Sequence, residues 1–273
     1  MRHLIGALVM IGLGIFLPLS NVHATERTVD LELVLAADIS DSIDEEEAAL
    51  QRQGFANAIR DPQVIAMIQR GPLGRIAVTY VEWSGVHTQN TLVDWTELSD
   101  AESARAFADA IVLPSVRIEQ WVQYTSISTL ILRAAHSFKG NRFQGRRRII
   151  DISGDGPNNR GTYVVLARDM AVADDITING LPIINDRPGP YGYPPMPNLD
   201  LYYEDCVIGG HGSFLIVAKG YRDFARAIRH KMLLEIAGSA PPLSLLRLAS
   251  NQVRPPCNAG ELELPPDWMF DFN

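Results

Sequence analysis

The stretch LVLAADISDSID, residues Leu33–Asp44, joins an apolar run to an aspartate and two serines at alternate positions. The apolar part belongs to a predicted strand, Leu31–Ala37, of the kind that is buried on both faces of a parallel sheet. Asp38, Ser40 and Ser42 follow directly after that strand. Because positions i, i+2 and i+4 of a turn can aim their side chains at one point, these three residues are candidates for a shared binding site.

Strand and helix patterns alternate through the rest of the chain. Acidic residues at 44–47 begin a predicted helix over 43–60, where they suit the positive end of the helix dipole. Ser99 and Glu102 predict a capping box at the start of another helix, and residues 89–98 alternate like an antiparallel edge strand. The pattern predicts an α/β fold with a doubly wound, mostly parallel sheet, flanked by helices, with that one antiparallel edge strand. The other predicted strands are residues 75–85, 147–156, 177–185 and 213–219, and the other predicted helices are residues 99–112, 125–138, 162–175 and 221–237.

The first 24 residues have the pattern of a secretory signal peptide. Arg2 and His3 precede an apolar run over residues 4–19, and the small residues Val22 and Ala24 follow it. We expect cleavage after Ala24 and a periplasmic or secreted mature protein. An uncleaved membrane anchor is the alternative, but the run is short for a bilayer span. We expect no transmembrane segment once the signal is removed.

Composition and charge narrow the class of protein further. Hydrophobic residues make up 47% of the 273 residues, which is enough for a full globular core. The formal net charge is −8, which argues against non-specific binding to a phosphate backbone. We therefore expect no nucleic-acid partner.

The α/β domain is expected to cover residues 25–238, followed by a Pro-rich tail over 239–273. Within the domain, residues 186–212 are rich in Pro, Gly and Tyr and predict a surface insertion. Cys206 lies in this insertion and Cys257 lies in the tail. Export implies an oxidising compartment, so a disulfide between them is expected, with two separate buried thiols as the alternative.

Oxygen-bearing side chains cluster where ligands bind in such sheets, at the carboxyl ends of the strands. Asp38, Ser40 and Ser42 follow the first strand, Thr125 precedes a helix, and Asp155 follows the strand over residues 147–156. Carboxylates and hydroxyls without any sulfur or imidazole suit a hard cation such as Mg²⁺, Mn²⁺ or Ca²⁺. Two carboxylates converging without a cation would repel each other and lose solvation.

This arrangement resembles the von Willebrand factor type A (vWA) domain. DISDS after an apolar strand is similar to the D-x-S-x-S signature of that family's metal-ion-dependent adhesion site, and the threonine and the later aspartate follow in the family's order. GDGPNN, residues 154–159, resembles the GDGxNN loop of an uncharacterised secreted bacterial branch of the family. The resemblance covers about Val29–Gly238, so the expected domain is vWA-like.

The resemblance implies both a metal site and a mode of binding. In such domains one divalent ion, here Mg²⁺ or else Mn²⁺ or Ca²⁺, keeps an open coordination position that a carboxylate of a partner protein commonly fills. The function implied is therefore an exported binding module that engages a protein ligand through an acidic residue. The implied ligand residues are Asp38, Ser40, Ser42, Thr125 and Asp155.

A Mg²⁺-dependent phosphatase of the haloacid dehalogenase type is the enzyme alternative. Those enzymes also begin with an apolar strand and an aspartate, in a D-x-D-x-T/V pattern, and end with a GDGxND-like turn. Here Ser40 replaces the second aspartate, a general acid, and a hydroxyl cannot do that work near neutral pH. Asn159 stands where a carboxylate is required, and Lys139 is the candidate for the required lysine. We expect no catalytic residues.

Two further alternatives involve the same residues. The ion could serve only to stabilise a scaffold. The serines could also remain as helix caps without binding metal, with Ser42 capping the helix that begins near Ile43.

Overall fold

A six-stranded sheet forms the centre of the molecule. The computed structural model describes residues 26–113, 124–187, 194–239 and 253–261. The strand order is β4-β3-β2-β6-β7-β8, and every neighbouring pair is parallel except β3 and β4. The predicted mostly parallel sheet with one antiparallel edge strand is therefore confirmed. The strands are β2 (Glu32–Asp38), β3 (Ile76–Trp83), β4 (Gln89–Leu98), β6 (Arg148–Gly154), β7 (Thr177–Ile184) and β8 (Ala218–Lys219).

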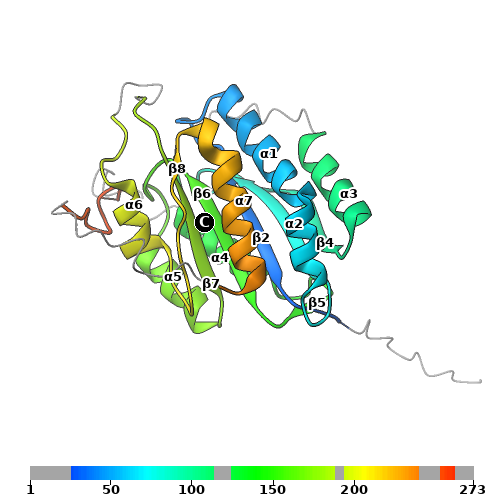
Figure 1. Ribbon diagram of the computed structural model, residues 1–273. Helices are drawn as coiled ribbons and strands as arrows, with labels where there is room; N and C mark the ends of the chain where they lie inside the picture. Colours follow the sequence, from blue (N-terminus) through cyan, green and yellow to red (C-terminus); the bar gives the residue numbers. More distant parts are fainter. Residues whose placement is uncertain (1–25, 114–123, 188–193, 240–252, 262–273) are drawn as a thin grey trace, which may run out of the picture.

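Helices cover both faces of this sheet. Helices α1, α2, α3 and α7 lie on one face (Figure 1), and α4, α5 and α6 lie on the other. Each face therefore has its own hydrophobic core, as the predicted doubly wound fold requires. The bounds are α1 (Glu45–Arg60), α2 (Pro62–Gln69), α3 (Ala101–Val112), α4 (Ile127–Ser137), α5 (Val164–Ala173), α6 (Leu199–Tyr202) and α7 (Phe224–Ala237).

The side chains of β2 alternate between the two cores. Leu33, Leu35 and Ala37 join the core beneath α1, α3 and α7, and Val34 and Ala36 join the core on the opposite face. A strand whose side chains are buried on both sides must be apolar on both sides. This is the physical reason for the apolar run that precedes the polar turn.

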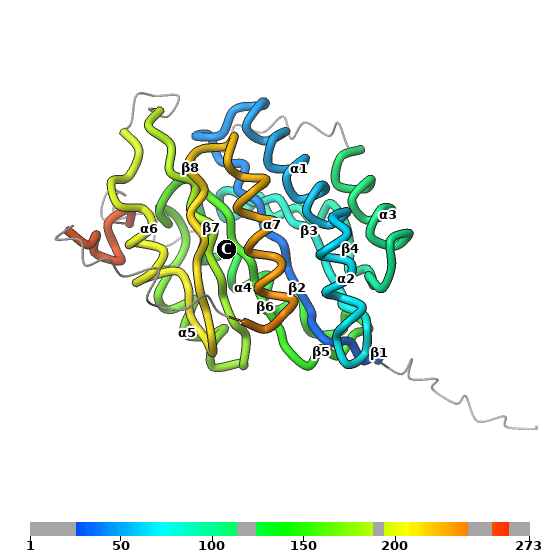
Figure 2. Tube along the Cα trace, viewed as in Figure 1, coloured from blue at the N-terminus to red at the C-terminus, as the bar shows by residue number. Residues whose placement is uncertain are grey.

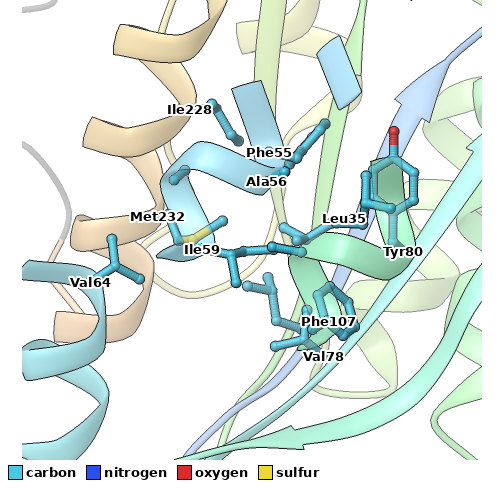
Figure 3. Packing of buried hydrophobic residues seen from close by; sticks show 14 of the residues in the cluster. Leu35, Phe55, Ala56, Ile59, Val64, Val78, Tyr80, Phe107, Ile228 and Met232 are labelled. Atoms are coloured by element: carbon cyan, nitrogen blue, oxygen red, sulfur yellow. The ribbon is translucent and has the colours of Figure 1, made fainter. Parts of the chain in front are cut away.

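Aromatic packing fixes α1 over the sheet. The ring of Phe55 on α1 meets Tyr80 of β3 and Phe224 of α7 edge-on, at a centroid separation of 5.3 Å in each pair. Figure 3 shows Phe55 and Tyr80 with Leu35 of β2. Gly54 permits this approach, because a Cβ there would lie 2.6 Å from Cδ1 of Phe224. Edge-to-face pairs add about 0.5–1.5 kcal/mol each beyond their buried area.

A small second sheet lies at the end where the chain enters. Strands β1 (Arg27–Val29) and β5 (Phe143–Gly145) pair in parallel. Glu32, the polar residue of the apolar run, is only 2% exposed and accepts bonds from Asn141 Nδ2 and from the Gly145 amide, both at 2.6 Å. Its carboxylate therefore ties β5 to the start of β2.

The predicted helix over residues 43–60 begins later and is followed by a second helix. Asp44 is the N-cap of α1 and forms a capping box with Glu47. Asp61 ends α1 and caps α2, which begins at Pro62. Proline at the first helical position explains the break, since it lacks the N–H that would continue α1. Helix α2 was not predicted.

The capping box predicted at Ser99 and Glu102 is wrong by one residue. Asp100 caps α3, and its side chain accepts from the amide of Ser103, whose hydroxyl accepts in return from the amide of Asp100. The Asp100 carboxylate is the stronger acceptor, because it carries a charge that the N-terminal helix dipole stabilises.

Residues 199–207, within the predicted insertion 186–212, contribute side chains to the interior. Helix α6 and the π-helical turn Tyr203–Val207 that follows it bury Tyr202, Tyr203 and Cys206 in the second core. The last predicted strand, 213–219, is reduced to β8 and a single bridge from Leu215. Helix α6 and the turn after it thus complete the core beside β7.

Cys206 and Cys257 form the predicted disulfide, with 5.3 Å between their Cα atoms. Residues 253–261, red in Figure 2, therefore lie beside α6 and α5 although they belong to the tail. No helix within the described ranges is both long and apolar enough to cross a bilayer.

Candidate metal centre

The candidate site lies at the carboxyl edge of the two central strands. Residues Ala37 of β2 and Ser153 of β6 are paired neighbours, so Asp38 and Asp155 leave the sheet side by side. The chain runs outward from β2 through β3 to β4 and then crosses back to β6. The edge between β2 and β6 is therefore the topological switch point, where open α/β sheets form their ligand crevices.

A chain of hydrogen bonds joins four of the five predicted ligand residues. The amide of Ser40 donates to Asp38 Oδ1 at 2.8 Å. The hydroxyl oxygens of Ser40 and Ser42 lie 3.3 Å apart, and Ser42 Oγ donates to Asp155 Oδ1 at 2.6 Å. Ser42 is thus turned toward Asp155, while Asp44 caps α1. The alternative in which Ser42 caps this helix is wrong.

Thr125 is held against the same loop by a different route. Its amide donates to Asn159 Oδ1 at 2.8 Å, and its carbonyl accepts from the amide of Asn159 at 2.9 Å. Thr125 Oγ1 lies 3.9 Å from the point that a Cβ on Gly156 would occupy. No described hydrogen bond joins Thr125 to the four other ligand residues, although it borders the loop that carries Asp155.

Burial and mutual repulsion act on the two carboxylates. Asp38 is fully buried, and its Oδ2 has no hydrogen-bond partner among the described residues. Burial raises the pKa of Asp38 well above its usual value, and the negative charge of Asp155 raises it further. Burial also raises the pKa of Asp155, against the opposing effect of the Ser42 hydroxyl, which donates to Asp155 Oδ1.

These residues fit a hard dication. An unpartnered buried carboxylate oxygen costs free energy unless a cation or proton meets it. Two carboxylates and three hydroxyls form an all-oxygen donor set of the kind that Mg²⁺, Mn²⁺ and Ca²⁺ prefer. Within the described residues, no group of three or more His, Cys, Asp or Glu side chains is placed to hold a metal. Besides the two carboxylates, the predicted ligand set consists of the serine and threonine hydroxyls.

Several supporting residues were not predicted. Gln51 of α1 donates to the carbonyl of Asp38 at 2.9 Å and accepts from Ser153 Oγ at 3.3 Å, linking both central strands. Asn158 accepts from the amide of Ser128 at 3.0 Å, at the start of α4. The GDGPNN motif was the available signal for the asparagines, whereas nothing around Gln51 in the sequence points to this role.

The rim of the site carries charges of both signs. Arg187 Nη1 lies 3.3 Å from Asp44 Oδ2 and 3.4 Å from Glu47 Oε1. The guanidinium of Arg160 stacks over the ring of Tyr124 at 4.8 Å. Tyr124, which directly precedes Thr125, is 38% exposed.

The sequence of residues 28–240 matches the family described as "Protein of unknown function (DUF1194)". The chain belongs to this family. A comparison of this DUF1194 chain with curated proteins found no match.

Solved structures with the vWA fold resemble the DUF1194 chain. Proximal thread matrix protein 1 (PTMP1) from the mussel byssus is 15% identical, with a TM-score of 0.54 over 78% of this chain and 49% of its own. A second PTMP1 structure, described as having a zinc-occupied MIDAS motif, is 14% identical with a TM-score of 0.52 over the same shares. The pilus adhesin SpaC from Lactobacillus rhamnosus GG is 12% identical, with a TM-score of 0.54 over 77% of this chain and 30% of its own.

These likenesses establish the fold, which is vWA-like as the sequence predicted. The DUF1194 chain spans about half the length of the PTMP1 chain and less than a third of the SpaC chain.

Proposed function

We propose that this chain is an exported vWA-like module that binds one divalent ion and uses it to engage a protein ligand. The observation that carries the proposal is the buried Asp38 carboxylate, whose Oδ2 has no hydrogen-bond partner among the described residues. Asp38 lies at the end of a hydrogen-bonded chain that leads through Ser40 and Ser42 to a second carboxylate, Asp155.

Five side chains would hold the ion. The carboxylates of Asp38 and Asp155 supply two negative charges, and the hydroxyls of Ser40, Ser42 and Thr125 supply neutral oxygens. When bound, Mg²⁺ or a similar ion supplies a hard positive centre that attracts a carboxylate oxygen of another protein. Ser42 is half-buried, whereas Asp38, Ser40 and Thr125 are buried, so the outward side of the site is the side of Ser42.

The solved structures with this fold support both halves of the proposal. One PTMP1 structure is described with zinc in its MIDAS motif, and PTMP1 and SpaC are a matrix protein and an adhesin. By analogy, we place an acidic residue of a partner protein at the open position of this site. The predicted leader over residues 1–24 and the disulfide both suit an exported protein.

The surroundings of Ser40 and Asn159 favour binding over phosphoryl transfer. Ser40 occupies the position of the phosphatase general acid, and its hydroxyl lies against Ser42. The side-chain oxygen of Asn159 accepts a hydrogen bond from the backbone amide of Thr125. Neither residue supplies the acid or the carboxylate that the enzyme alternative requires.

Replacing Asp38 by Asn separates metal binding from folding. Asp38→Asn keeps the size of the side chain and removes the buried charge, so we expect Mg²⁺ binding to disappear while the metal-free protein remains at least as stable. In wild type, Mg²⁺ at 100 times its Kd should stabilise the fold by about 2.7 kcal/mol. Titration calorimetry and thermal unfolding, each with and without Mg²⁺, measure the two effects.

Asp30→Asn is the matched control for this experiment. Asp30 is also a buried aspartate, but it accepts from the Leu73 amide near the start of β2, away from the site. The control should bind Mg²⁺ like wild type. Equal binding by wild type and Asp38→Asn would refute the metal site. A partner interaction that persists in chelator, despite intact metal binding, would favour the scaffold alternative.

A further inference from the structure

The segment 253–261, here called the clasp, is attached to the domain at three points through residues 253–257. Asn198 Nδ2 donates to the carbonyl of Val253 at 3.0 Å. Arg254 pairs with Glu204 and Asp205, each at 2.5 Å. The disulfide joins Cys257 to Cys206. The clasp lies beyond the residues that match the DUF1194 family, 28–240, yet it returns to the domain.

The end of the clasp reaches the loop of the candidate metal centre. Glu261 is only 4% exposed, and its Oε1 accepts from Asn158 Nδ2 at 2.7 Å and from the Val164 amide at 2.9 Å. The second contact places its carboxylate at the start of α5, where the helix dipole favours a negative charge. Glu261 thus joins a loop residue to a helix terminus.

Asn158 connects this contact to the elements that carry the proposed ligands. Asn158 is fully buried, and its side-chain oxygen also accepts from the backbone amide of Ser128 at the start of α4. Its backbone amide donates to the Tyr202 hydroxyl at 3.1 Å. Asn158 follows Asp155 by three positions and precedes Asn159, which holds Thr125. Two proposed ligands therefore depend on the position of this short loop.

The clasp also approaches the loop through its backbone. A Cβ on Gly260 would lie 2.5 Å from the carbonyl oxygen of Asn158 and 3.0 Å from Cγ of Pro157. Only glycine permits this approach without displacing one of the two segments. The loop is thus braced by contacts with the Asn158 side chain and with its own backbone.

We propose that Glu261 is a positioning residue for the metal centre. By fixing Asn158, the clasp holds the loop that carries Asp155 and supports Thr125, and so sets the affinity of the site for its ion. Metal sites need their ligands fixed by such outer contacts, within about 0.5 Å of the binding geometry. This inference rests on the proposed function. It assigns to a tail segment outside the matched family region a role in the site.

Substitution of Glu261 tests the role directly. In Glu261→Ala, Asn158 Nδ2 and the Val164 amide lose a shared acceptor, and we expect Mg²⁺ to bind about tenfold more weakly, at the low end for outer contacts. Backbone amides over residues 156–162 should exchange faster in the metal-free protein. Glu261→Gln keeps an acceptor oxygen, so it should recover most of the affinity and of the exchange protection. Titration calorimetry and hydrogen exchange read these two quantities.

Glu32→Ala is the matched control. Glu32 is similarly buried and also accepts from one asparagine side chain and one backbone amide. It lies at the start of β2, at the opposite end of the strand from Asp38. The control should lose stability while Mg²⁺ affinity and exchange over 156–162 stay at wild-type values.

The outcomes separate this inference from the proposed function. If wild type binds Mg²⁺ and Glu261→Ala binds it equally well, the positioning role is refuted and the metal site stands. If wild type binds no Mg²⁺, the proposed function fails, and so does the role of Glu261 in metal affinity. An affinity loss as large in Glu32→Ala would also overturn it, because the effect would then follow from lower stability alone.

Discussion

Gly154 lies close to two buried polar groups, the Asp38 carboxylate and the Tyr203 hydroxyl. A Cβ at this position would lie 2.9 Å from Asp38 Oδ2 and 2.9 Å from the Tyr203 hydroxyl. Both groups are fully buried, so neither can move aside into solvent. The first glycine of GDGPNN therefore leaves room for both the Asp38 carboxylate and the Tyr203 hydroxyl.

Gly154→Ala should destabilise the protein. The added methyl overpacks a rigid site, which costs about 1–3 kcal/mol, and we also expect weaker Mg²⁺ binding because Asp38 must move. Gly156→Ala is the control, since its nearest neighbour would be Thr125 Oγ1 at an ordinary 3.9 Å. Urea unfolding of both variants measures the difference. A Gly154→Ala protein as stable as Gly156→Ala would contradict the tight packing around Asp38.

The candidate ligands could be predicted from sequence because their pattern is local. Asp38, Ser40 and Ser42 follow one strand in a fixed spacing, and Asp155 lies in a short motif. Gln51 and Glu261 could not be predicted, because each reaches the site from a distant segment through the tertiary fold. Metal binding itself stays a prediction.

At the scale of elements, a buried ionic cluster ties α7 to the sheet. Lys231 Nζ lies 2.5 Å from Asp151 Oδ1 of β6 and 2.6 Å from Glu235 Oε1, and all three side chains are fully buried. Asn179 of β7 donates to Glu235 Oε1 at 2.8 Å. Two carboxylates and one ammonium leave one negative charge in excess. Burial, with the charge of Glu235, raises the pKa of Asp151 to about 7 against the opposing effect of Lys231.

The free energy of unfolding should depend on pH through the protonation of the Asp151 carboxyl. The pKa of the Asp151 carboxyl is raised from 3.8 to about 7 in the folded protein. Its contribution to stability is therefore fully present below the pKa of the unfolded chain, and it is lost as pH rises through the pKa of the folded protein. We expect Asp151→Asn to gain stability relative to wild type across this window, by up to about 1.4 kcal/mol per pH unit. Denaturant unfolding of both proteins at a series of pH values provides the test. A stability difference between the two proteins that does not change with pH would show that Asp151 is charged in the folded protein throughout this window.

Predictions of elements succeeded where periodicity was strong and failed where tertiary contacts decide. The alternation of residues 89–98 correctly indicated the antiparallel edge strand β4. Helix α2 was missed because Asp61 and Pro62 end one helix and begin the next within two positions. The strand over 213–219 shrank to β8 because its first residues lie beside β7 with only single-bridge pairing at Leu215.

At the scale of the whole molecule, the disulfide makes the tail part of the domain. Replacing both Cys206 and Cys257 by Ser frees a closed loop whose ends are 51 residues apart. The chain-entropy relation gives a loss on the order of 4 kcal/mol for a loop of this length. Denaturant unfolding of the double variant, with reduced wild type as a second comparison, measures it. A change within about 0.5 kcal/mol would mean that the other clasp contacts suffice.

The parallel direction of β2 and β6 separates the entry of the chain from the candidate site. Strand β2 runs seven residues from Glu32 to Asp38, roughly 20 Å, so β1 lies near one end of β2 (Figure 2) and the candidate site lies at the other end. A tether fused ahead of Arg27 would leave the end of β2 that carries the candidate site free in solution, whereas one fused after Glu261 would start beside the Asn158 loop. Immobilised binding measurements on this protein should therefore attach it by its amino-terminal side.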